Sequence, residues 1–417
     1  MPSVAWPDIR QQLFAKRRGA QRYMRMTSHA ATPTDAEAIP NLNTRNVALD
    51  RVRTFLTLVV LLHHAVIPYT YFGQTDAKSW IGFDAIILAT DSFFMAMFFF
   101  LSGLFVWPSL ADKEAEKFLR DRLLRLALPF ALAALTVIPI AYFAIALRRS
   151  PGTTFAVFWW KTITVGPWPS GPVWFAWVLL AFDLTASVLY RVSPNLVDPI
   201  NRLSLRGCGR PTDFFIFLLV MTAMLYIPMR IYFGPGRWFE FGPFSVQASR
   251  VLLYPAYFMI GVGVGAANLH RGLLSMDGRL AKNSWVWAVA ALAPYCLLWA
   301  LIFVKRGMLE NPVWLPAWYE ASYGFFFSAF SAATLFAILG YFLRFKRSGR
   351  SMLDRMQAEA YGMFLVHYPI VLWLQYWLFD FEMPAIAKAT VVFVLTVVSS
   401  WAVTGILRKI PGAARVL

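Results

Sequence analysis

Ten apolar segments dominate this sequence, and each is long enough to form a helix that crosses a lipid bilayer. They lie at residues 54–72, 87–108, 123–147, 172–190, 213–233, 251–268, 284–304, 320–343, 360–379 and 385–407. Because 59% of the residues are hydrophobic and only 15% are charged, we expect these segments to form the body of the protein. The chain is therefore predicted to be an all-α, polytopic membrane protein with about ten transmembrane helices.

The regions on either side of these segments differ from them in composition. Residues 1–45 are basic and polar and contain no apolar core of a signal peptide, so we expect a flexible cytoplasmic arm. A membrane domain is expected over residues 46–407, followed by a short cytoplasmic tail over residues 408–417.

Basic residues are distributed unevenly between the two sides of the predicted membrane domain. Of the 39 lysines and arginines, 29 fall on the side of the N-terminal arm and 10 on the other side. Since positively charged loops remain in the cytoplasm, both termini are predicted to be cytoplasmic in a multi-pass protein of the inner (plasma) membrane. The same rule accounts for the net charge of +17, so the expected partner is the lipid bilayer and not nucleic acid.

The first apolar segment carries the most informative pair of polar side chains, Arg53 and His64. They are eleven residues apart, which is about three helical turns or ~17 Å, so both lie on one helix face. Asp50 falls close to the same face, whereas His63 is rotated away by about 100°. We expect His64 near the centre of the bilayer, where an ionisable side chain is costly to bury and is usually functional.

Two further arginines, Arg122 and Arg125, lie where the third segment enters the membrane. They are three residues apart and therefore neighbours on an α-helix. One interpretation is an anchor whose cationic side chains reach the membrane surface. The other is a clamp for phosphate, because the planar guanidinium matches phosphate oxygens. Charge alone favours neither.

Polar and small residues inside other segments are candidate supporting residues. Ser102 and Gly103 allow a backbone to approach, although a simple packing notch is the commoner explanation. His367 is expected about 12 Å from the cytoplasmic face. Asp183 and Asp91 lie within segments, where each could orient a histidine or face a water-filled cavity.

No metal site or permanently bound cofactor is predicted. Cys208 lies in a basic loop and Cys296 in an apolar segment, which indicates neither a disulfide framework nor a metal site. The glycines of Gly261-Val-Gly-Val-Gly265 follow no predicted strand, so close helix packing is favoured over nucleotide binding.

Six motifs, taken in order, resemble the membrane acyltransferase-3 family. They are Arg53 with His64, Phe99-Phe-Leu-Ser-Gly103, Arg122-x-x-Arg125 with Pro129, Val173-Trp174-Phe175, Gly261–Gly265 and Tyr361-Gly-x-x-Leu-Val-His367. The resemblance covers residues 45–407 or nearly so. It implies an integral membrane enzyme that moves an acyl group of the acetyl or succinyl class. The donor would be acyl-CoA, bound as a substrate, and the acceptor a hydroxyl of a glycan or other cell-envelope molecule.

Within this family the sequence looks nearest to the branch that contains glucan succinyltransferases. The Ser102-Gly103 region and the Arg125-Leu-Ala-Leu-Pro129 run carry that likeness. There is one departure, because some relatives have a histidine where Phe94 stands here.

The resemblance also implies roles for the polar residues. Arg53, Arg122 and Arg125 would hold the phosphates of coenzyme A at the cytoplasmic edge. His64 would be catalytic, as a general base or as the carrier of a covalent acyl group. The supporting residues would be Asp50, Ser102, Gly103, Trp174, Asp183 and His367.

A different class of protein also fits buried ionisable residues. In a transporter or exporter of a glycan or lipid-linked substrate, intramembrane histidines and aspartates relay protons. Such proteins often contain internal inverted repeats, and none is visible in this sequence.

Overall fold

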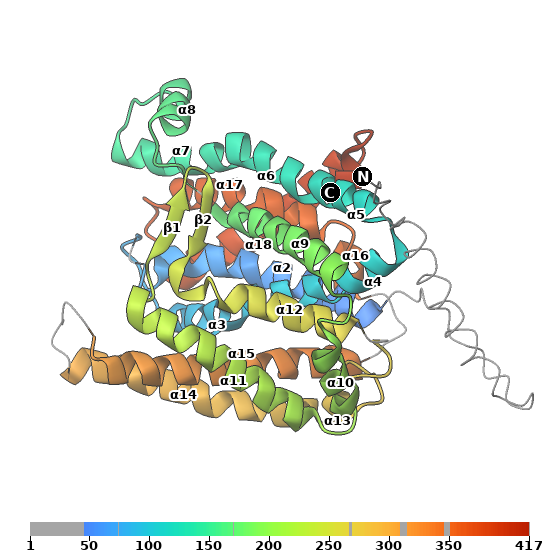
Figure 1. Ribbon diagram of the computed structural model, residues 1–417. Helices are drawn as coiled ribbons and strands as arrows, with labels where there is room; N and C mark the ends of the chain where they lie inside the picture. The colour runs from blue at the N-terminus through green and yellow to red at the C-terminus, as the bar shows by residue number, and fades with distance from the viewer. Residues whose placement is uncertain are drawn as a thin grey trace, which may run out of the picture. The chain divides into compact units, whose positions relative to one another are not determined.

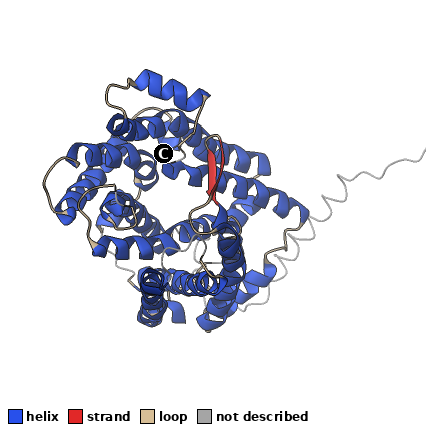
Figure 2. Ribbon diagram, turned by 90° about the vertical axis from the view of Figure 1, so that its left-hand side faces the viewer, coloured by secondary structure: helices blue, strands red, loops and turns tan. Residues whose placement is uncertain are grey.

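A computed structural model describes residues 46–73, 75–169, 171–266, 269–308, 315–345 and 351–416. The compact unit that begins at Val47 is a bundle of helices with one small β-hairpin (Figure 1 and Figure 2). The predicted all-α class is therefore confirmed. The arm predicted for residues 1–45 lies outside the described residues.

Among the described residues, nine helical segments are long and apolar enough to cross a membrane. They correspond to nine of the ten predicted segments: α2 (Val47–Val66), α3 (Ile81–Gly103), the segment Ala115–Arg149, α9 (Trp174–Val192), α11 (Pro211–Phe233), α12 (Leu253–Gly265), α14 (Ser284–Met308), α15 (Ala317–Arg344) and α18 (Ala385–Leu407). The tenth prediction corresponds to α17 (Ala360–Leu378), which contains His367 and Gln375 and packs against α2 and α18.

Short elements connect these helices or follow the last of them. They are η1 (Ile67–Tyr69), α4 (Val106–Asp112), α8 (Phe155–Thr164), η4 (Gly171–Val173), α10 (Asp198–Gly207), β1 (Trp238–Phe241), β2 (Phe244–Gln247), η5 (Ala248–Arg250), α13 (Arg279–Lys282), α16 (Met352–Met356) and α19 (Ala413–Val416). The strands β1 and β2 pair antiparallel at one end of the bundle, which we call the hairpin end. The opposite end, where α2 begins and α18 ends, is called the terminal end.

The predicted starts of the first two segments are wrong, because both helices begin before their apolar runs. Helix α2 begins at Val47 instead of residue 54, and its early turns include Arg51, which pairs with Asp354 at 2.7 Å. This guanidinium holds the pKa of Asp354 well below its usual range. Helix α3 begins at Ile81 instead of residue 87, and the buried carboxylate of Asp84 in its first turn accepts two backbone hydrogen bonds.

The third segment is one long helix that contains two wider π-helical turns. It comprises α5 (Ala115–Arg122), η2 (Leu123–Ala127), α6 (Leu128–Leu132), η3 (Ala133–Val137) and α7 (Ile138–Arg149). Pro129 has no N–H, so the carbonyl of Arg125 loses its helical partner and accepts a hydrogen bond from the Tyr361 hydroxyl at 2.7 Å. The carbonyl four residues before Pro139 likewise accepts a hydrogen bond from Trp159 at 2.8 Å. These prolines thereby attach the segment to α17 and α8.

Helices α3 and α12 approach so closely that only glycine fits between them. A Cβ atom added to Gly103 would overlap the carbonyl oxygen of Phe258, and one added to Gly261 would overlap that of Phe100. Gly265 is confined in the same way. The packing interpretation of these glycines is therefore confirmed.

Candidate active site

The imidazole of His64 lies among aromatic side chains of α17. Its ring centroid is 5.4 Å from that of His367 and 5.1 Å from that of Tyr368. The structure therefore brings together His64 and His367, which the sequence separates by about 300 residues. His64 was expected near the middle of its segment, but it lies in the last turn of α2, toward the hairpin end. The reason is that the helix spans Val47–Val66 and so begins earlier than the predicted segment 54–72.

His367 is completely buried, and its tautomer follows from its hydrogen bonding. Its Nδ1 atom lies 2.7 Å from the carbonyl oxygen of Phe364. A carbonyl only accepts hydrogen bonds, so Nδ1 donates and the neutral ring keeps a lone pair on Nε2. Within the described residues Nε2 has no hydrogen-bond partner. An accepting nitrogen is thus held beside His64 in a rigid side chain.

His63 has a different environment from His64. Its Nδ1 lies 2.7 Å from the hydroxyl of Thr90, which itself donates to the carbonyl of Ile86 at 2.8 Å. The ring of Phe94 packs on the other side at a centroid distance of 4.9 Å. His63 therefore connects α2 to α3, while His64 faces α17, as the helical phase predicts.

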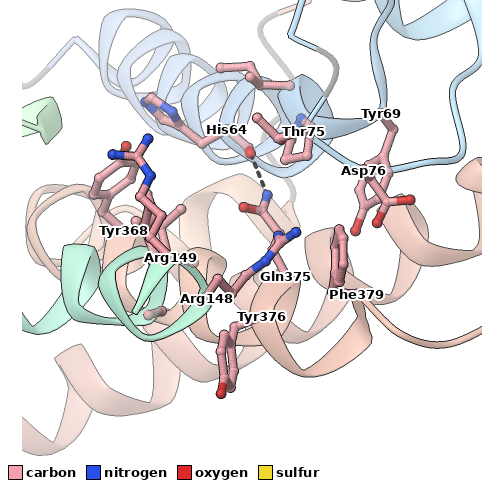
Figure 3. A pocket seen from close by; sticks show the side chains of 15 residues that line it. His64, Tyr69, Thr75, Asp76, Arg148, Arg149, Tyr368, Gln375, Tyr376 and Phe379 are labelled. Atoms are coloured by element: carbon pink, nitrogen blue, oxygen red, sulfur yellow. Dashed lines mark hydrogen bonds between the residues drawn. The ribbon is translucent and has the colours of Figure 1, made fainter. Parts of the chain in front are cut away.

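The position of His64 along α2 is fixed by another proline. Pro68 has no N–H to donate to the carbonyl of His64, four residues earlier. The side-chain amide of Gln375 on α17 donates to that carbonyl instead, at 2.9 Å (Figure 3). The backbone of the candidate catalytic residue is thereby held by the same helix that packs against its ring.

His64 and Tyr368 lie in the wall between two cavities in the hairpin half of the bundle. One, the Arg148 cavity, has a volume of about 450 Å³ and is lined by Arg148, Arg149 and Gln375. The other, the Trp174 cavity, has a volume of about 380 Å³ and is lined by Trp174, whose ring stacks on Tyr254 at 5.5 Å. His64 therefore borders both cavities.

The predicted arginines lie at the terminal end. Arg53 packs its guanidinium over the ring of Phe105, 4.4 Å from the centroid, and lies 3.5 Å from Asp50. Arg122 is within electrostatic reach of Arg53 and pairs with Asp183 at 3.2 Å. Asp183 therefore pairs with an arginine and does not orient His64. Arg53 and His64 lie on one helix, as predicted.

The prediction that Arg122 and Arg125 are neighbours on a regular α-helix is wrong, while their contact with phosphate stays a prediction. Arg122 is half-buried, but Arg125 is exposed, because it lies in the wider π-helical turn and not in a regular α-helix. Gly103 packs against α12, with Ser102 half-buried beside it.

Several residues of the site were missed in the sequence. Tyr368 directly follows His367, and that adjacency was a usable signal. Arg148 and Arg149 also left a signal, since they are basic residues on the side that carries few. Gln375 and Arg250, which pairs with Asp91, gave none because they become neighbours of the site only through helix packing.

The chain is thus a polytopic membrane protein with a histidine site buried among its helices. Residues 46–405 match the acyltransferase domain family, which is more than half of the chain. No curated protein and no solved structure gives a significant match. The chain belongs to the acyltransferase-3 family and is a membrane acyltransferase.

Proposed function

We propose that this acyltransferase moves an acyl group from acyl-CoA to a hydroxyl of a glycan or another cell-envelope acceptor. The observation that carries the proposal is the position of His64. It shares a helix face with Arg53 and lies between two cavities at the other end of the bundle. Both termini are cytoplasmic in this proposal, and the membrane is the inner, or plasma, membrane.

The donor binds at the terminal end. Arg53, Arg122 and the exposed Arg125 offer guanidinium groups to the phosphates of coenzyme A. The distance of ~17 Å from Arg53 to His64 along the helix suits the long, slim pantetheine arm. The thioester carbon then reaches His64 from the cytoplasmic side, while the acceptor enters a cavity at the hairpin end.

His64 acts as the general base. Its accepting nitrogen takes the proton of the acceptor hydroxyl as the oxygen attacks the thioester carbonyl. The tetrahedral intermediate collapses, the C–S bond breaks, and the proton passes to the departing thiolate of coenzyme A. His367 is a positioning residue, and the buried Nε2 beside His64 supports that role. Transfer through an acyl-histidine is the covalent variant.

The proposal is tested by following the free thiol of coenzyme A. The purified protein in nanodiscs is incubated with acetyl-CoA or succinyl-CoA and an envelope glycan extract, and the acylated products are identified by mass spectrometry. Thiol release that requires the extract and is lost in His64→Ala is expected. Release that is unaffected by His64→Ala would contradict the assigned base.

A further inference from the structure

Two adjacent arginines that the proposed mechanism leaves unused line the cavity that reaches His64. Arg148 and Arg149 form the last turn of α7, and both are exposed. Figure 3 shows Arg149 extending toward Tyr368 and His64, and Arg148 extending toward Gln375. Two positive charges therefore line the same cavity as the candidate base.

Among the described residues that line the cavity, no acidic side chain is left to offset these charges. Among its described lining residues the acidic one is Asp76, which pairs with the buried Lys388 at 3.0 Å. The guanidinium of Arg148 packs over the ring of Phe379, at 3.2 Å from the centroid. The cavity is therefore positively charged and partly aromatic.

A purely structural explanation accounts for only part of this arrangement. Basic residues at the C-terminus of a helix interact favourably with its dipole. That explanation requires no cavity and no proximity to His64. These two arginines also belong to the 10 basic residues on the side of the membrane domain that carries few. The positive-inside rule does not explain why two arginines stand next to each other on that side.

We infer that the Arg148 cavity binds a carboxylate group of a substrate whose reacting atom meets His64. This rests on the proposed function in placing a substrate at His64. Arginine forks make paired, charge-assisted hydrogen bonds with carboxylates. The anion belongs either to the acceptor or to the acyl group, as in a dicarboxylic acyl chain.

The acceptor source is tested by direct binding to the purified full chain in nanodiscs. Calorimetric titrations compare methyl glucuronide with methyl glucoside, which differ in one carboxylate. If the acceptor carries the anion, the wild type binds the glucuronide roughly ten- to hundred-fold more tightly. The double variant Arg148→Gln/Arg149→Gln then binds both probes equally.

The acyl source is tested in the same way with succinyl-CoA and acetyl-CoA. If the acyl group carries the anion, the wild type distinguishes these two donors and the double variant does not, while the two glycosides bind alike. Arg237→Gln is the matched control, because Arg237 is exposed at the hairpin end and packs on Phe233 but lines neither cavity. It should retain the preference of the wild type.

Equal binding within both probe pairs, or no binding of any probe, overturns the inference. So does a preference that persists in the double variant. Failure of the proposed function has a separate signature. In that case acyl-CoA is not turned over with any glycan extract, while the calorimetric preference and its loss in the double variant are still measured.

Discussion

At the scale of single residues, the two adjacent histidines of α2 have separate tasks. His63 is tied to Thr90 on α3, whereas His64 lies beside His367 and lines both cavities. We predict that His64→Ala lowers kcat by about 10²- to 10⁴-fold, the usual contribution of a general base. His63→Ala should keep measurable transfer, because it removes a hydrogen bond worth roughly 0.5–1.5 kcal/mol and not a reacting group.

The measurement is thiol release by both variants at matched amounts of folded protein. An inactive but well-folded His63→Ala would contradict the assignment by helical phase. His367→Ala is expected to fall between the two, because it removes a neighbour of His64 and leaves the base itself.

The arginines at the terminal end pose a second question at this scale. Under the clamp interpretation, Arg122→Lys and Arg125→Lys keep the charge but lose the planar fork. We expect each change to raise the KM for acyl-CoA roughly ten- to hundred-fold, equivalent to about 1.5–3 kcal/mol for one charge-assisted hydrogen bond. Steady-state kinetics across a range of acyl-CoA concentrations gives the KM.

Arg120→Lys is the matched control, since Arg120 is an exposed arginine of the same helix outside the motif. Its KM should equal that of the wild type. If both motif variants also keep the wild-type KM, Arg122 and Arg125 are membrane anchors.

At the scale of elements, α17 compensates for hydrogen bonds that prolines remove from other helices. Gln375 donates to the carbonyl freed by Pro68, and Tyr361 donates to the carbonyl freed by Pro129. A helix surrounded by lipid must satisfy its backbone internally or through neighbouring helices. The carbonyls freed by these two prolines therefore become specific attachment points, and one of them belongs to His64.

This role predicts the effect of Gln375→Leu, which keeps the size of the side chain but leaves the His64 carbonyl unpaired. We expect a stability loss of about 1–3 kcal/mol and a lower kcat, because the backbone of His64 is released. Thermal unfolding and thiol release measure the two effects. Gln357→Leu is the control, because the buried Gln357 amide nitrogen has no described partner. Equal losses in both variants would disprove the special role of Gln375.

The contact between α3 and α12 gives a second prediction for elements. Gly261→Ala places a methyl group against the carbonyl oxygen of Phe100, and a backbone cannot move aside as a side chain can. We expect the helices to separate, with a stability loss of at least about 1–3 kcal/mol. Gly405→Ala has open space and should be neutral or slightly stabilising. Size-exclusion profiles and melting temperatures of the two variants decide the point.

At the scale of the whole molecule, the sequence predicts what depends on neighbouring residues and misses what depends on packing between helices. Apolar length places the spans, and helical phase places Arg53 and His64 on one face. The start of α2 is misjudged because charged residues pair across the terminal end, as Arg51 does with Asp354. The contact of His64 with His367 and the two cavities arise from α2 meeting α17, which no local pattern specifies.

The orientation in the membrane remains a prediction at this scale, and it determines which side the cavities face. The distribution of 29 basic residues against 10 predicts that the terminal end is cytoplasmic. Alkaline phosphatase, which is active only outside the cytoplasm, should be inactive when fused after Leu417 and active when inserted at Gly152. The loop at Gly152 suits insertion because the glycine has a positive φ and open space around it.

The opposite activity pattern would contradict both the predicted topology and the proposed positions of the donor and the acceptor. With the membrane domain inverted, the Arg148 cavity would open toward the cytoplasm, and Arg53, Arg122 and Arg125 would face away from the pool of acyl-CoA. His64 would then meet cytoplasmic molecules through its cavities, and an envelope acceptor would have no route to it. The two fusions therefore test whether the line from Arg53 to His64 runs from the donor side to the acceptor side.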